Sequence, residues 1–118
     1  MGVLSIAFEL RPAEEFLSAT WIDYFEDSDE HGPALHQAVH AVRNSSLKVT
    51  AKSGFTRGTV ADISGACAEK KPRVRFLHEE EPDNRAHAAL RHWPQDQLLY
   101  EQLADRHWCE LHLNKDIP

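Results

Sequence analysis

The sequence is poor in cysteine: Cys67 and Cys109 are the only two among 118 residues. Two cysteines do not make the disulfide framework that is typical of a small secreted domain. A chain of this length can also bury enough surface to fold without a disulfide or a structural metal. We therefore expect a cytoplasmic protein in which both thiols are reduced.

Long apolar runs are missing as well. A membrane-spanning helix needs about 20 consecutive apolar residues, and every hydrophobic stretch of this chain is interrupted well before that length. Residues 1–10 include Glu9 and no basic residue, so they do not have the pattern of a secretory signal. The sequence predicts a protein without a membrane segment.

Basic residues are in the minority, with 13 Lys and Arg against 19 Asp and Glu, and the formal net charge is −6. Non-specific nucleic-acid binding depends on Lys and Arg that neutralise phosphates, so nucleic acid is not an expected partner. Eight histidines accompany this acidic balance, and protonating all of them would change the charge from −6 to +2. The acids are concentrated at residues 26–30 and 79–83, so the charge points mainly to two segments.

Hydropathy patterning predicts a mixture of strands and helices. Residues 3–10 are apolar-rich, and residues 47–52 and 73–78 alternate between apolar and polar side chains, which is typical of half-buried strands. Apolar residues recur at helical spacing elsewhere. The predicted helices lie at residues 18–25, 33–42, 59–67, 84–90 and 94–108.

Residues that commonly cap helices precede three of these segments: Ser18 or Thr20, Thr59, and Asn84. The order of the elements favours an α+β or small α/β fold, with a three-stranded sheet covered by about four helices. The length fits a single domain, residues 1–118. Residues 109–118 are expected to form a loose tail.

The most informative segment follows the strand predicted at residues 73–78, a position where functional loops are common. His78 and His87 flank a turn, and with Asp83 or a glutamate they would supply imidazole and carboxylate ligands for a divalent metal such as zinc. The same groups could act as general base and orienting residue, which makes His78, Asn84 and His87 the candidate catalytic residues. The competing interpretation is structural, with Asn84 as a helix cap and the acids in solvent, because no metal-binding signature matches.

Two further histidine groups have ligand chemistry without a matching signature. Residues 107–112 combine imidazole and thiol groups that suit zinc, but the spacing is not that of a zinc finger. A helix end with a neutral, buried Cys109 is favoured instead. His36 and His40 are four residues apart on one predicted helix, but the metalloprotease glutamate between them is absent. We expect an exposed helix face there.

The loop at residues 52–59 contains two glycines between a predicted strand and a predicted helix. Its amides and the helix dipole could hold an anion, assisted by Lys52, Arg57 and Thr59. It lacks the patterns of the phosphate-binding and dinucleotide-binding loops, so an ordinary connection is the favoured alternative. Elsewhere, Trp21 and Tyr24 are either core residues or anchors for a partner, since interfaces are enriched in Trp and Tyr.

Residues 17–25, LSATWIDYF, resemble an LSxxWLEYF motif, and residues 78–90 resemble an HDPxPDNPAHAAI motif. Both motifs belong to a family of small uncharacterised bacterial proteins of about this length. The family pattern places its His, Asn and second His at His78, Asn84 and His87. This chain differs at residues 79–81 and 85, where two prolines are replaced and acidic charge is added. The resemblance implies a bacterial source but no reaction.

No nucleophile–base set or cofactor loop is recognisable in the sequence, whereas aromatic and acidic segments offer a surface for a partner. We therefore expect a small non-catalytic binding module of a bacterial multi-protein system, with a protein partner and no cofactor. Its binding residues would be Trp21, Tyr24, His78, Asp83, Asn84 and His87. The alternative is a metal-dependent hydrolase or metal-binding protein that uses His78, His87 and a nearby carboxylate.

Overall fold

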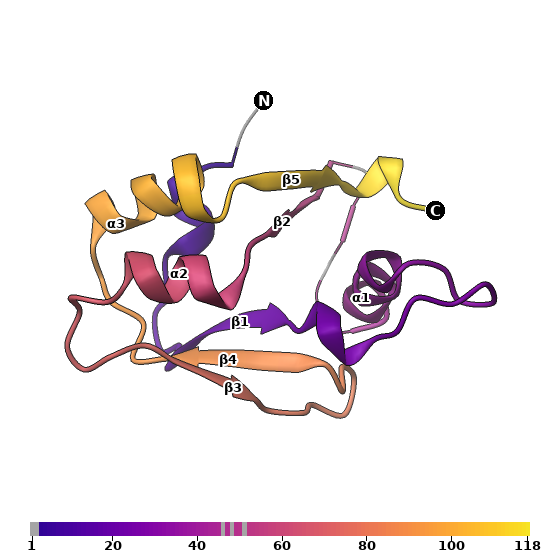
Figure 1. Ribbon diagram of the computed structural model, residues 1–118, viewed down its shortest axis with the longest axis horizontal. Helices are drawn as coiled ribbons and strands as arrows, with labels where there is room; N and C mark the ends of the chain where they lie inside the picture. Colours follow the sequence, from indigo (N-terminus) through magenta and orange to yellow (C-terminus); the bar gives the residue numbers. More distant parts are fainter. Residues whose placement is uncertain (1–2, 46, 48, 51) are drawn as a thin grey trace.

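Three α-helices and two small antiparallel sheets make up an α+β fold within residues 3–45, 47, 49–50 and 52–118, which this computed structural model describes (Figure 1). The larger sheet has the strand order β1-β4-β3. Its strands are β1 (Phe16–Thr20), β4 (His87–Arg91) and β3 (Arg75–His78). The smaller sheet pairs β2 (Gly54–Arg57) with β5 (Glu110–Leu113).

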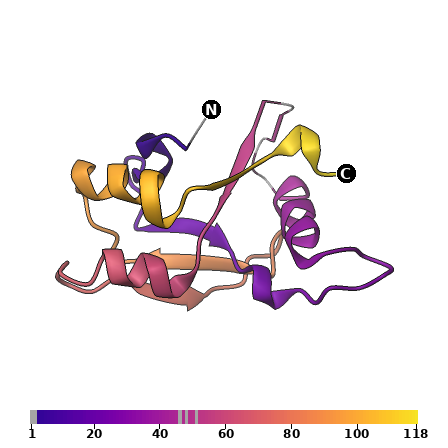
Figure 2. The ribbon, with the colours of Figure 1, turned by 45° about the horizontal axis from the view of Figure 1, so that its top comes forward.

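The helices lie on one side of the three-stranded sheet, together with the β2–β5 pair (Figures 1 and 2). They are α1 (Ala34–Arg43), α2 (Val60–Ala66) and α3 (Gln97–Gln102). A π-helical turn at Leu103–His107 continues α3. Within the described chain, no helix or strand covers the other face of this sheet. Alternating strands typically leave one sheet face uncovered in this way.

The core lies between the three-stranded sheet and this layer. Its buried members are Phe8, Ile63, Cys67, Leu90, Trp93, Leu99, Tyr100, Leu103 and Trp108. The indole N–H of Trp93 donates to the carbonyl of Phe8 at 2.6 Å, and that of Trp108 donates to the carbonyl of Thr56 at 3.2 Å. Large aromatic rings therefore fill the core while their polar atoms stay hydrogen-bonded.

Several predicted elements are confirmed. Helix α1 coincides with the predicted helix, and β3 lies within the predicted strand. Thr59 caps α2, because its hydroxyl oxygen accepts a hydrogen bond from the amide of Asp62 at 3.1 Å. The helix predicted at residues 94–108 begins later, after the N-cap Asp96, and divides into α3 and the π-helical turn.

Three predicted elements in the segments that build the larger sheet and its approach have another structure. Residues 3–10 contain a 3-10 helix at Ser5–Phe8 rather than a strand. Residues 16–20 form β1, and the only helical part of the predicted first helix is a 3-10 turn at Ile22–Tyr24. Residues 87–91 form β4, the central strand, where the sequence predicts a helix at residues 84–90. Pairing with a neighbour on each side overrides local helix propensity there.

The strand predicted at residues 47–52 includes residues 48 and 51, which lie outside the described residues. Its described residues 47, 49, 50 and 52 belong to no strand, and β2 begins later, at Gly54. The sheet pattern therefore differs from the predicted single three-stranded sheet, because β2 and β5 form a separate pair.

Residues 109–118, where the sequence favours a loose tail, form β5 and a 3-10 turn at Asn114–Asp116. Arg43 of α1 holds this segment through its guanidinium. It donates to the side-chain oxygen of Asn114 at 2.8 Å and to the carbonyl oxygens of Asn114, Ile117 and Pro118 at 3.0, 2.7 and 2.7 Å. These acceptors lie more than 70 positions along the chain from Arg43, so their contact is a product of the tertiary fold.

Candidate functional site

The two sequence motifs lie side by side in the fold. The first motif contributes β1 and the second contributes β4, and the antiparallel register sets Thr20 opposite His87. Pairing continues one residue beyond β1, where the amide of Trp21 donates to the carbonyl of Ala86 at 2.8 Å. Residues about 65 positions apart in the sequence therefore build one local structure.

Asn84 organises the turn between β3 and β4. It is 8% exposed, and its side-chain amide donates to the hydroxyl of Thr20 at 3.0 Å. Its side-chain oxygen accepts from the amide of Ala86 at 3.1 Å, and its backbone exchanges two hydrogen bonds with Glu81, each 3.0 Å long. Asn84 therefore stabilises a turn rather than capping a helix, which corrects the predicted helix at residues 84–90.

His87 is buried, with both ring nitrogens engaged. Nδ1 lies 2.8 Å from the carbonyl oxygen of Glu79, which can only accept, so Nδ1 carries a proton. Nε2 lies 3.1 Å from the hydroxyl of Ser18 and 3.7 Å from a carboxylate oxygen of Glu81. In the neutral ring Nε2 accepts the Ser18 hydrogen bond, so this arrangement joins β1 to the β3–β4 loop.

His78 and His87 do not converge. Side chains alternate between the faces of a sheet, and directly paired residues share a face. Thr20 pairs with His87, whereas His78 pairs with Ala88, the next residue along β4. The two imidazoles therefore lie on opposite faces of the three-stranded sheet.

Three other rings of the two motifs do converge, and we call Trp21, Tyr24 and His78 the aromatic patch. The ring centroid of His78 lies 5.3 Å from that of Trp21 and 5.5 Å from that of Tyr24, and those two are 6.4 Å apart. Trp21 and Tyr24 are 43% and 41% exposed, and His78 is exposed as well. Nε2 of His78 lies 2.7 Å from the carbonyl oxygen of Arg85, a hydrogen bond that orients the ring. The patch is therefore both ordered and accessible.

Acidic residues lie close to the members of this patch in the sequence. Asp23 lies between Trp21 and Tyr24 in the sequence. Glu26 is two residues after Tyr24, and Glu80 is two residues after His78. All three acids are exposed. We call Asp23, Glu26 and Glu80 the acidic rim. Asp83, another predicted binding residue, is exposed at the tip of the same turn.

Glu79 is not part of this rim, because Arg91 binds it. The guanidinium donates to both carboxylate oxygens of Glu79, each at 2.6 Å, in a bidentate pair. This hydrogen bonding holds the pKa of the Glu79 carboxyl below its usual value. The sequence gives no signal for the pair, since the two residues meet only through the register of the β3–β4 hairpin.

Among the described residues, no group of three or more His, Cys, Asp or Glu side chains is placed to hold a metal ion. In the 107–112 group, His112 hydrogen-bonds Glu110 at 2.9 Å, which lowers the pKa of the Glu110 carboxyl. Cys109 is exposed rather than buried as predicted. The buried thiol is Cys67, and desolvation raises its pKa.

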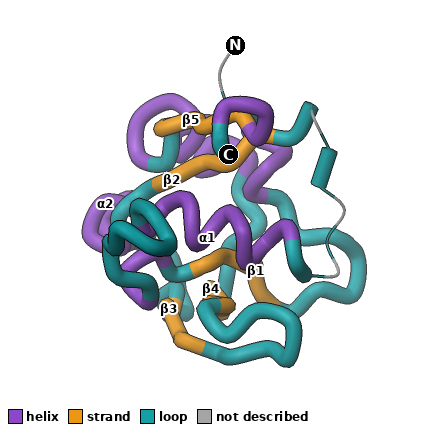
Figure 3. Tube along the Cα trace, turned by 90° about the vertical axis from the view of Figure 1, so that its right-hand side faces the viewer, coloured by secondary structure: helices purple, strands orange, loops and turns teal. Residues whose placement is uncertain are grey.

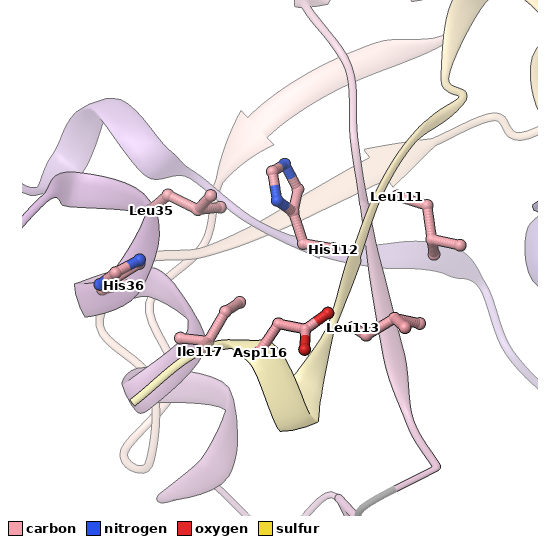
Figure 4. A pocket seen from close by; sticks show the side chains of 7 residues that line it. All are labelled: Leu35, His36, Leu111, His112, Leu113, Asp116 and Ile117. Atoms are coloured by element: carbon pink, nitrogen blue, oxygen red, sulfur yellow. The ribbon is translucent and has the colours of Figure 1, made fainter.

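His36 and His40 differ in their surroundings. Nε2 of His40 lies 2.7 Å from the carbonyl oxygen of Pro118. His36 lines a shallow depression of about 500 Å³ between α1 and β5 (Figure 4). Its remaining lining residues are Leu35, Leu111, His112, Leu113, Asp116 and Ile117. Four aliphatic side chains therefore share the lining with two imidazoles and one carboxylate.

Half of the predicted anion-binding loop, Gly54–Arg57, is strand β2. Arg57 is the last residue of β2 and lies 3.7 Å from Glu110, while the Thr59 hydroxyl is occupied as the cap of α2. Lys52 is exposed in the turn before β2. The three predicted anion ligands therefore have separate structural surroundings and do not form a cradle.

Within the part of the chain that the structure describes, no helix is both long and apolar enough to cross a bilayer. In comparisons with known proteins, no family model matches the chain, and neither a curated protein nor a solved structure matches it.

Proposed function

We propose that this chain is a small, non-catalytic protein-binding module of a bacterial multi-protein system, and that its aromatic patch binds a cationic segment of the partner protein. The observation that supports the proposal is the meeting of Trp21, Tyr24 and His78, which brings exposed rings from two separate motifs onto one surface. The proposal includes no metal and no cofactor.

The exposure of the patch favours a binding role. Trp and Tyr are enriched among the residues that contribute most to protein–protein affinity, because they bury large areas with few rotatable bonds. Trp21 and Tyr24 are each more than 40% exposed, although apolar rings of this size usually belong to the core. Burying them against a partner removes this apolar surface from water.

The surrounding charge favours a basic partner segment. Arg and Lys side chains are attracted to the faces of Trp and Tyr rings. The acidic rim of Asp23, Glu26 and Glu80 would pair with neighbouring cations of the same segment, and the chain as a whole carries a net charge of −6. The hydrogen bond from His78 to the Arg85 carbonyl keeps the third ring in place as a stacking surface.

The setting of the proposal comes from the sequence. The bacterial source rests on the resemblance of residues 17–25 and 78–90 to the family motifs, and membership of that family is part of the proposal. A cytoplasmic location is proposed because Cys67 and Cys109 are unpaired, as is usual for thiols in a reducing compartment.

Titration of the isotope-labelled protein with an oligo-arginine peptide, followed by NMR, tests the proposal. We expect resonances of Trp21, Tyr24 and His78 to shift, and the affinity to fall as salt is added. An oligo-glutamate peptide of equal length should not bind. Trp21→Ala should weaken oligo-arginine binding about tenfold or more, since a central Trp commonly contributes over 1 kcal/mol.

Leu98→Ala is the matched control, because Leu98 is 64% exposed on α3 and lies outside the patch. It should leave the affinity for oligo-arginine unchanged. Equal binding of the two peptides, or equal affinity of Trp21→Ala and the unaltered protein, would contradict the proposal.

A further inference from the structure

We propose that the open edge of β3 pairs with β3 of a second copy of this chain, so that two three-stranded sheets join into one. β3 is an outer strand, since the strand order is β1-β4-β3, and it lies at the margin of the sheet in Figure 3. An outer strand presents unpaired N–H and C=O groups, which can recruit another strand. This inference does not depend on the function proposed for the aromatic patch.

The register with β4 determines which groups face the open edge. The amide of Glu79 donates to the carbonyl of His87 at 3.0 Å. Alternate residues of an antiparallel strand direct their N–H and C=O groups to the same neighbour. The odd-numbered residues of β3 therefore face β4, and Phe76 and His78 direct their backbone groups toward the open edge.

The charges along this segment change sign at its centre. The residues before the centre include three cations, Lys71, Arg73 and Arg75, and the residues after it include four acids, Glu79, Glu80, Glu81 and Asp83. An antiparallel pairing of two copies centred on Leu77 sets Phe76 of each copy opposite His78 of the other. The backbone N–H and C=O groups of these two residues, which face the open edge, would then hydrogen-bond across the dimer. This register sets Arg75 opposite Glu79, which Arg91 of the same copy also binds. Just beyond the ends of β3 it sets Arg73 opposite Glu81, and each of these pairs forms twice.

This charge order selects a second copy over other strands. Outer strands are commonly protected by like charges that repel a second copy. In β3 and its flanking residues, the cations before Leu77 and the acids after it would attract a second copy, because opposite charges across a strand pair stabilise the pairing. A partner strand of uniform charge would match only half of the segment and be repelled by the other half.

The central position also favours self-pairing. Leu77 lies opposite Ala89 and therefore on the face of the sheet that no described element covers, where it is half-buried. In the proposed register Leu77 meets its own counterpart, because directly paired side chains share a face. Pairing would remove further apolar surface of both leucines from water.

Sedimentation equilibrium of the full chain, with concentrations raised to about 1 mM, tests for the dimer. We expect a monomer–dimer equilibrium. Amide hydrogen exchange at Phe76 and His78 should slow as the concentration rises, whereas exchange at Leu77, already bonded to β4, should not change. A monomer at every concentration overturns the inference, as does a dimer in which Phe76 and His78 gain no protection.

Charge exchange provides the matched variants. Arg73→Glu sets two acids opposite each other in both halves of the dimer, so dimerisation should weaken about 30-fold. Glu81→Arg should have a similar effect. The double variant restores opposite charges and should recover the original dissociation constant to within about threefold. Failure of this recovery, in a double variant that retains the circular dichroism spectrum, overturns the inference.

Lys115→Glu is the control for net charge, because it makes the same charge change on the exposed turn that follows β5. It should leave the dissociation constant unchanged. Sedimentation measures the dimer and the oligo-arginine titration measures the aromatic patch, so the two proposals have separate readouts.

Discussion

At the scale of single residues, the polar side chains of the second motif take their roles from partners far along the chain. Asn84 and His87 are the two buried polar residues of the described chain. Asn84 bonds Thr20, and His87 bonds Ser18 and the carbonyl of Glu79. Buried polar groups need such partners, because leaving one unsatisfied costs about 1–3 kcal/mol. These two side chains therefore hold the β3–β4 turn against β1. His78 ends β3 beside this turn, so the arrangement of the aromatic patch depends on them.

A glycine provides a test of packing at the same scale. A Cβ at Gly58 would lie 2.9 Å from Cδ1 of Trp108 and 3.1 Å from the carbonyl oxygen of His107. Gly58→Ala should therefore lower the free energy of unfolding by about 2 kcal/mol, the usual cost of overpacking. Urea denaturation measures the change.

Gly65→Ala is the matched control, because nothing lies within 4 Å of a Cβ at that position in α2. Alanine is the better helix former, so this variant should raise the free energy of unfolding by about 0.5–1 kcal/mol. Equal effects of the two substitutions would show that the Gly58–Trp108 contact is not tight in solution.

At the scale of elements, pairing between strands decided which segments are strands where the local hydropathy pattern did not. The residues 86–90, AHAAL, have good helix propensity, and yet they form most of a central strand with neighbours on both sides. Within this strand Ala89 is fully buried. The cap of α2 was predictable, because the Thr59 hydroxyl accepts its hydrogen bond from the amide of Asp62, only three residues away in the sequence. Local signals therefore predicted α1 and the start of α2, while β1, β4 and β5 required long-range partners.

Arg43 tests whether the segment after β5 depends on α1. Its guanidinium donates to Asn114, Ile117 and Pro118, and charged donors contribute about 1.5–3 kcal/mol in partly buried positions. Arg43→Ala should lower the free energy of unfolding by about 2 kcal/mol. It should also speed amide exchange in β5, which NMR measures.

Arg106→Ala is the control for Arg43, because the Arg106 side chain is 75% exposed and pairs with its neighbour Asp105. Its effect on stability should be within about 0.5 kcal/mol. If both alanine variants lose the same stability, Arg43 does not hold the segment.

At the scale of the whole molecule, ion pairs on separate elements give a common pH dependence. The pKa values of three carboxyls are lowered: Glu79 by Arg91, Asp96 by Lys70 and Glu110 by His112. Each carboxyl binds protons more weakly in the folded chain than in the unfolded one. Their contributions are present above the unfolded pKa values and are lost as the pH falls through the lower, folded values.

The free energy of unfolding should therefore decrease as the pH is lowered from about 5, the upper end of ordinary carboxyl titration. Urea denaturation at a series of pH values measures this decrease. Arg91→Gln removes the bidentate partner of Glu79, so the decrease should become shallower. Arg106→Gln, on an exposed side chain, should leave the slope unchanged. A slope that is the same in all three proteins would exclude a contribution from the Glu79–Arg91 pair.

The sequence by itself determined the mixture of helices and strands, the acidic charge and the two segments that contribute the patch. These properties depend on residue types and on short-range spacing. Only the tertiary structure decided that His78 and His87 lie on opposite faces and that His78 meets Trp21 and Tyr24. The physical reason is strand register: a shift of one residue moves a side chain to the other face, and register is set by partners distant in the chain.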